Sequence, residues 1–168
     1  MNVAERVGRV LAGICIVGGL ACSDAGLDAK KFDAVQIAAQ SVRADAHTNN
    51  SSGSARFGEL LETLKSETAV AERLVDGRPE KAALRSYADA AEAYRYFLRF
   101  RDLDPGAAGD MILLRGSNRP VAIRYGIPRE ERGGGRWVNR KTAMAAFSTK
   151  ADEALAEAAR IVGSHRAR

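Results

Sequence analysis

Apolar residues recur every three or four positions through most of this chain, and the widest apolar face belongs to residues 79–103. This spacing places side chains on one side of an α-helix. The central members of the face are Leu84, Tyr87, Ala88, Ala91, Tyr94 and Leu98. Its flanks add Ala90, Ala93, Phe97, Phe100 and Leu103. A face this wide predicts a central helix that contacts more than one neighbouring helix.

Three further segments show the same periodicity, at residues 30–48, 54–75 and 139–162. Their apolar positions are Phe32, Val35, Ala38, Ala39, Val42 and Ala46; Phe57, Leu60, Leu61, Leu64, Thr68, Ala71 and Leu74; and Met144, Phe147, Ala151, Ala154, Leu155, Ala158, Ile161 and Val162. Turn-forming residues separate the first three helices, and Gly163 is expected to end the last one. Because short links join antiparallel neighbours, we predict an all-α protein folded as an antiparallel four-helix bundle.

The chain between the third and fourth long helices is less regular, and we predict an irregular insert there. Residues 110–115 are a short apolar run that fits either one helical turn or an extended segment. Residues 118–126 fit a two-turn helix that ends at Gly126. Residues 129–135 combine charged residues with three consecutive glycines, which predicts an exposed flexible loop.

The first 21 residues have the pattern of an export signal. A basic stretch precedes an apolar run at residues 10–20, which is too short to span a bilayer. The run leads into Leu-Ala-Cys-Ser at residues 20–23. This tetrapeptide resembles the lipobox of bacterial lipoproteins, although Gly19 stands three positions before the cysteine, where leucine is usual. The resemblance implies that Cys22 is lipidated and becomes the N-terminus of an exported protein.

The two cysteines support this interpretation, because Cys15 lies in the apolar run and Cys22 alone remains after cleavage. We predict a signal peptide at residues 1–21, a tether at 22–29 and a helical domain at 30–165. In Gram-negative lipoproteins an aspartate after the cysteine usually favours the inner membrane, so with Ser23 at that position the resemblance implies attachment to the periplasmic face of the outer membrane if the cell is Gram-negative. One alternative is plain cleavage after Ala25, which gives a soluble periplasmic or secreted protein. The other is an uncleaved anchor or a cytosolic protein.

Basic charge is concentrated in residues 115–141. This segment carries eight lysine and arginine residues against Glu130 and Glu131, a net charge of +6, while the rest of residues 22–168 carries −2. The candidate contact residues are Arg119, Arg124, Arg129, Arg132, Arg136 and Arg140, together with Trp137, the only tryptophan. Arginine matches the oxygens of phosphate and carboxylate, and an indole can stack or enter an interface. We predict a surface for lipid head groups, lipopolysaccharide or an acidic protein; the alternative is an ordinary solvated loop with Trp137 packed on the helices.

Other chemistry has little support in the sequence. His47 and His165 lack metal-ligand spacing, and the part after the signal contains no nucleophile motif. We therefore predict no metal, no cofactor and no enzymatic activity. Nucleic acid is disfavoured as a partner, because the chain is predicted to be exported.

The leading functional hypothesis is a non-enzymatic lipoprotein, tethered to an envelope membrane, that binds or scaffolds a partner through residues 115–141. A second hypothesis places a small-ligand or enzyme site between the helices near Tyr94 and Tyr96. Aromatic residues at helical spacing are usually core residues, which weighs against the second hypothesis. A third hypothesis is a purely structural envelope protein without a specific partner.

Overall fold

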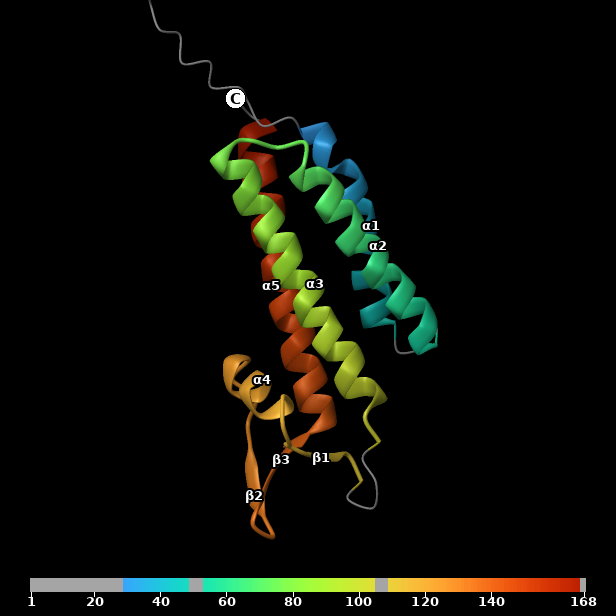
Figure 1. The fold of residues 1–168 in the computed structure, drawn as a ribbon, viewed down its shortest axis with the longest axis vertical. Helices are drawn as coiled ribbons and strands as arrows, with labels where there is room; N and C mark the ends of the chain where they lie inside the picture. Colours follow the sequence, from blue (N-terminus) through green and yellow to red (C-terminus); the bar gives the residue numbers. More distant parts are fainter. Residues whose placement is uncertain (1–28, 49–52, 105–108, 167–168) are drawn as a thin grey trace, which may run out of the picture.

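The computed structural model describes residues 29–48, 53–104 and 109–166 (Figure 1). These residues are mostly helical, with a small sheet at one end. The long helices lie side by side and are α1 (Asp33–His47), α2 (Ser54–Glu72), α3 (Arg78–Asp102) and α5 (Arg140–Arg166). A short 3₁₀ helix, η1 (Ala29–Phe32), precedes α1. The four predicted helical segments are therefore confirmed to within a few residues.

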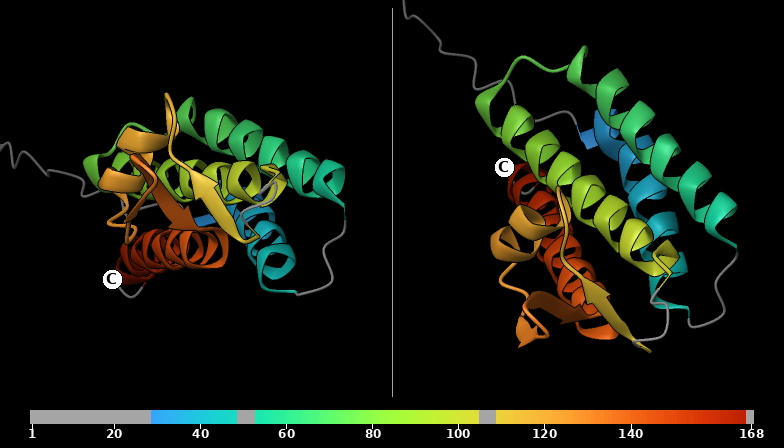
Figure 2. Two further views of the ribbon diagram at one scale, coloured as in Figure 1. Left: turned by 90° about the horizontal axis from the view of Figure 1, so that it is seen from below. Right: turned by 60° about the horizontal axis from the view of Figure 1, so that its bottom comes forward.

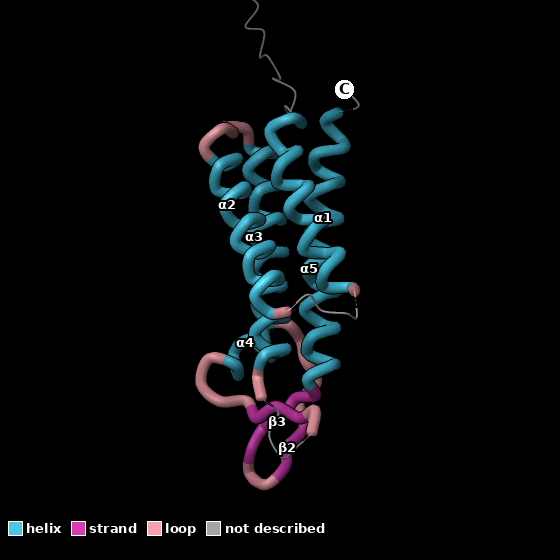
Figure 3. The backbone as a smooth tube through the Cα atoms, turned by 90° about the vertical axis from the view of Figure 1, so that its right-hand side faces the viewer, coloured by secondary structure: helices cyan, strands magenta, loops and turns pink. Residues whose placement is uncertain are grey.

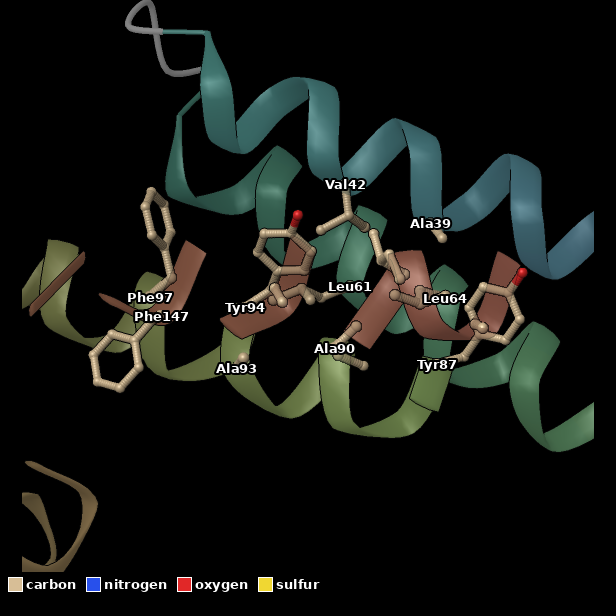
Figure 4. Close-up of a cluster of buried hydrophobic side chains, with 14 of the residues drawn as sticks. Ala39, Val42, Leu61, Leu64, Tyr87, Ala90, Ala93, Tyr94, Phe97 and Phe147 are labelled. Carbon is tan, nitrogen blue, oxygen red and sulfur yellow. The ribbon is translucent and has the colours of Figure 1, made fainter. Parts of the chain in front are cut away.

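The central position of α3 explains the width of its apolar face, because α3 contacts α1, α2 and α5. Its buried residues are Ala83, Leu84, Tyr87, Ala90, Ala91, Ala93, Tyr94, Phe97 and Phe100. Figure 4 shows Val42 of α1 and Leu61 of α2 close to Tyr94 of α3. The alanines let the helix axes approach, and burial of each large side chain stabilises the fold by about 1.5–3 kcal/mol. We call α1, α2, α3 and α5 together the helical part.

Two helix ends differ from the prediction. α2 ends at Glu72, and in the turn that follows the Leu74 N–H donates to the Ala71 carbonyl. Helical periodicity stops there, so Leu74, which was predicted on the inner face, is 55% exposed and Val75 is buried instead. α5 continues through the predicted stop at Gly163. A glycine inside a helix costs only about 1 kcal/mol relative to alanine, which is not enough to end a well-packed helix.

The insert contains a three-stranded antiparallel sheet that the all-α prediction missed. β2 (Glu130–Arg132) and β3 (Gly135–Asn139) form a hairpin, and β1 (Met111–Leu113) pairs with the other edge of β3. The prediction of a flexible loop at residues 129–135 is therefore wrong. Gly133 and Gly134 have φ of +57° and +77°, and two positive φ values in succession are what the tightest hairpin turns require. For residues 110–115, the extended alternative is confirmed.

The predicted short helix is confirmed as α4 (Asn118–Arg124). α4 and the sheet lie at the end of the molecule where α3 finishes and α5 starts (Figures 2 and 3). Tyr125, after α4, packs edge-on against Phe147 of α5 with ring centroids 4.9 Å apart. Val138 of β3 and Ile112 of β1 are paired in register, and both are buried in the core. These contacts attach residues 109–139, which we call the sheet end, to the helical part.

Candidate anion-binding site

A hollow of about 650 Å³ opens on the sheet end, between the hairpin tip, the end of β1 and the start of α4. Four arginines line it: Arg115, Arg119, Arg132 and Arg136. The other lining residues are Leu113, Leu114, Gly133, Gly134, Gly135 and Trp137. We call this site the basic hollow. It brings together four of the predicted contact residues and adds Arg115, a member of the predicted basic segment.

The strand pairing explains why these arginines meet. Arg132 ends β2 and Arg136 is the second residue of β3, so the two flank the glycine turn. On the other side of β3, the Leu114 N–H donates to the Arg136 carbonyl over 2.8 Å, which extends the pairing of β1 by one residue. Gly116, with φ of +51°, then turns the chain into α4, and Arg119 lies in the first turn of that helix.

Gly135 and Trp137 fix the shape of the hairpin tip. A Cβ atom on residue 135 would lie 2.7 Å from Leu113 Cδ1 and 3.1 Å from Trp137 Nε1. Any side chain there would force its neighbours to move, so this strand position favours glycine. The Trp137 indole N–H donates to the Arg132 carbonyl oxygen over 3.0 Å. The only tryptophan of the chain is therefore tied across the hairpin and forms one wall of the basic hollow.

The four arginines differ in whether a carboxylate neutralises them. Arg132 and Arg136 form ion pairs with hairpin glutamates, at 2.5 Å and 3.4 Å respectively. Exposed pairs of this kind stabilise a protein by only about 0.2–1 kcal/mol, so a ligand can replace them at little cost. Arg115 and Arg119 have no carboxylate partner among the residues that the structure describes. The basic hollow therefore keeps two guanidinium groups available.

The groups that line the basic hollow are chemically suited to binding anions rather than to acid–base chemistry. Arginine stays protonated in proteins and presents several N–H donors in a planar fork. The remaining lining residues are glycine, leucine and tryptophan, whose side chains contain neither a nucleophile nor a proton acceptor. This set of side chains favours non-covalent binding of phosphate or carboxylate groups.

Three predicted contact residues do not line the basic hollow. Arg124 binds both carboxylate oxygens of Glu92 in α3, at 3.0 and 2.9 Å, and this pairing raises the pKa of Arg124. Arg140 binds Asp110, which precedes β1, at 3.0 Å. Arg129 is exposed beside β2 and has no carboxylate partner within the described ranges. Arg124 therefore links α4 to α3, and Arg140 links the start of β1 to α5.

Tyr94 and Tyr96, the centre of the second hypothesis, both pack against other rings. Tyr94 is fully buried, and its ring lies edge-on to Phe57 with centroids 6.1 Å apart. Tyr96 packs against Tyr125 and Phe147, with centroids 5.7 and 5.8 Å away. These contacts give both tyrosines a structural role in the core.

A polar cluster that the sequence did not reveal surrounds Asp152 of α5. Asp152 Oδ1 accepts a hydrogen bond from the Tyr94 hydroxyl at 3.2 Å and lies 2.9 Å from Arg43 Nε. Asp152 Oδ2 lies 2.9 Å from His47 Nε2. Burial is the main reason that the pKa of Tyr94 lies well above its ordinary value, and the Asp152 charge adds to it. Because these residues come from α1, α3 and α5, the cluster holds three helices together.

Neither metal binding nor similarity to a known protein assigns a function to the chain. Within the described ranges, no three histidine, cysteine or acidic side chains are grouped to hold a metal ion. None of the helices that the structure describes is long and apolar enough to cross a membrane. Cys22, the predicted signal peptide and the predicted tether up to Asp28 lie outside the described residues. No family model, no curated protein and no solved structure matches the chain.

Proposed function

We propose that this protein is a non-enzymatic lipoprotein of the cell envelope that binds or scaffolds an anionic partner through its basic hollow. In this proposal, residues 1–21 are a signal peptide and a lipid on Cys22 anchors the chain to a membrane. The four long helices form an antiparallel four-helix bundle that supports the site. The observation that carries the proposal is the gathering of four arginines around one hollow, two of them without a carboxylate partner in the described ranges.

The charge of the basic hollow supports this choice of ligand. Four arginines and the two hairpin glutamates that pair with them leave a net charge of +2. Guanidinium groups that share a small volume repel one another, and a bound anion relieves that repulsion. Each charge-assisted hydrogen bond to the anion would contribute about 1.5–3 kcal/mol. An anionic group is therefore the ligand that the site stabilises most.

The test compares two double variants of the full chain that lose the same amount of charge. R115A/R119A removes the arginines of the basic hollow that lack a carboxylate partner, and R73A/R85A removes two exposed arginines far from it, one directly after α2 and one in α3. In a calorimetric titration with inorganic polyphosphate, we expect R115A/R119A to bind at least about tenfold more weakly than wild type, because two charge-assisted contacts are lost. We expect R73A/R85A to bind like wild type. Equal weakening in both variants would mean that net charge attracts the anion without a defined site.

The lipid anchor is tested separately, by intact mass and membrane partition of the expressed protein and of its Cys22→Ser variant. We expect a diacylglycerol-type mass increase on a chain that begins at Cys22, and no such increase in the variant. A soluble product that retains residues 1–21 would contradict the anchor. That result would not bear on anion binding by the basic hollow, which the polyphosphate titration tests independently.

A further inference from the structure

The two ends of the molecule carry different features. The described chain begins in η1, which contacts α5 at the end of the molecule opposite the sheet (Figure 1). The basic hollow lies at the other end, where α5 starts after β3. α5 has 27 residues, so at about 1.5 Å per residue these two ends are about 40 Å apart.

The predicted tether is shorter than this distance. Ala29, the last residue of the predicted tether at 22–29, already belongs to η1, so seven residues, 22–28, separate the lipidated end of the chain from η1. Even when fully extended, at about 3.5 Å per residue, they would reach only about 25 Å. A molecule whose helices stand end-on to the membrane therefore cannot turn over to set its sheet end on the membrane that carries it.

We infer that the basic hollow faces away from the membrane of attachment and binds phosphate groups presented from the opposite side. This inference rests on the proposed function, and in particular on the anchor at Cys22. The anchor then fixes the η1 end near one surface, and the helical part holds the arginines about 40 Å away from it. The protein would connect its own membrane with a phosphate-bearing surface or polymer that faces it.

The number of arginines favours phosphate over carboxylate. Four guanidinium groups around one hollow offer more N–H donors than the two oxygens of a single carboxylate can accept. A phosphate group presents more acceptor oxygens and can carry more negative charge, so it can engage several guanidinium groups together. A facing lipid membrane and a soluble phosphorylated polymer share this chemistry, and the experiment separates them.

The experiment fixes the anchor chemically and uses Trp137 as its reporter. In the full chain with Cys15→Ser, Cys22 is the single thiol, and it is coupled to maleimide lipids in phosphatidylcholine vesicles. Trp137 is the only tryptophan and lines the basic hollow, so its fluorescence reports on that site. Phosphatidylglycerol mixed with a phospholipid that carries a nitroxide head group is placed either in separate vesicles or in the carrier vesicles. A third arm adds soluble polyphosphate to the tethered protein.

We expect quenching of Trp137 by the separate vesicles, or a fluorescence change with soluble polyphosphate, and no quenching by labelled lipid in the carrier vesicles. The first response identifies a facing membrane as the source of phosphate, and the second identifies a soluble polymer. In either case R115A/R119A should weaken the response at least about tenfold, and R73A/R85A should leave it unchanged.

Two other outcomes overturn the inference in distinguishable ways. Quenching by labelled lipid in the carrier vesicles would show that the basic hollow reaches its own membrane. Anion binding by the site, and with it the proposed function, would then still stand. No response in any arm, together with no binding of polyphosphate by the untethered chain, would remove the proposed function as well.

Discussion

The helical part and the sheet end share one hydrophobic core, but they differ in the length of their elements and in the polar contacts that supplement the core. In the helical part, aromatic and small side chains fill the space between the long helices, and the carboxylate of Asp152 is engaged by three neighbours. The sheet end has strands of only three to five residues, and it is attached to the helices by buried side chains such as Val138 and by ion pairs at Glu92 and Asp110. The arginines of the basic hollow lie on this smaller region. The comparison indicates that the helices supply the stability and the sheet end supplies the charged surface.

The largest effect is expected where the two regions meet, at Phe147. Its fully buried ring contacts Phe100 of α3 at 5.0 Å and Tyr125 of the sheet end at 4.9 Å. F147A would leave a cavity in both interfaces and lower the free energy of unfolding by about 3–5 kcal/mol. Urea denaturation followed by circular dichroism measures this loss. The control is I123A in α4, at a side chain that is 53% exposed, and its effect should stay within about 0.5 kcal/mol. Equal effects at the two positions would contradict the shared core.

A smaller loss of stability is expected from D152A, which acts on the helical part alone. Without the carboxylate, the buried Tyr94 hydroxyl loses its acceptor and Arg43 loses its ion pair. We expect the free energy of unfolding to fall by about 1–3 kcal/mol. E153A removes the neighbouring carboxylate, which pairs with Lys150 on the surface, and should cost less than about 1 kcal/mol. If the two variants unfold at the same urea concentration, the cluster around Asp152 does not join the helices.

The helical part was largely predictable from the sequence, and the sheet end was not. Burial in a helix follows the same repeat as the apolar pattern, so Phe57, Tyr87 and Phe147 were assigned to the inner face and are buried. Strands of three residues are too short to show the alternation that identifies a strand. The apolar run at residues 110–115 therefore fitted a helical turn as well as an extended segment. The hairpin at residues 130–139 was not predicted, and its first part was predicted as a loop.

The candidate site was predictable only as a concentration of charge. Nothing in the spacing of the arginines distinguishes Arg119, which lines the basic hollow, from Arg124, which is bound by Glu92. That difference depends on which carboxylates the fold brings near each arginine. The Asp152 cluster was missed for the same reason, because His47 lies 105 residues away from Asp152 in the chain.

Alkaline pH should weaken the helical part through Tyr94. Burial raises the pKa of Tyr94 in the folded protein, whereas in the unfolded chain the hydroxyl ionises near its ordinary pKa of about 10. The contribution of the neutral hydroxyl is complete below that value and is lost as the pH rises towards the folded pKa, by about 1.4 kcal/mol per pH unit. Urea unfolding at pH of about 9 and about 11 should show a shallower loss in Y94F than in wild type. Y125F should reduce this pH-dependent loss of unfolding free energy by less than Y94F does, because Tyr125 is only half-buried. Identical pH profiles for wild type and Y94F would exclude Tyr94 as the cause.

Two glycines allow the same substitution to be compared between the regions. G135A places a Cβ 2.7 Å from Leu113 Cδ1, and it should destabilise the sheet end by about 1 kcal/mol, since that δ-carbon can rotate away. G163A meets no atom within 4 Å inside α5, and it should stabilise the protein by about 0.5–1 kcal/mol through the higher helix propensity of alanine. The measurements are the free energy of unfolding of both variants and the fluorescence of Trp137. Only G135A should change the fluorescence. A stabilising G135A would mean that the hairpin tip is not tightly packed.

The smallest effect is expected at Asp110, the ion-pair hub of the sheet end. Hydrogen bonds from Lys141 and Arg140 lower the pKa of this partly exposed carboxyl below its ordinary value. A carboxyl of this kind stabilises the fold above its unfolded pKa of about 4, and the contribution is lost as the pH falls through the folded pKa. D110N should therefore raise amide hydrogen exchange in β1 at neutral pH, relative to α2, and the difference from wild type should disappear in acid.

The Asp110 result also bears on the basic hollow, because β1 leads within two residues to Arg115. If the ion pairs at Asp110 hold β1 in register, D110N should weaken polyphosphate binding slightly at neutral pH, even though the variant adds positive charge to the protein. Simple charge attraction predicts the opposite sign, since removing a carboxylate should strengthen the binding of an anion. Stronger binding by D110N would therefore show that charge outweighs the positioning of Arg115. Weaker binding would show that the arrangement of the arginines, and not their number alone, determines affinity.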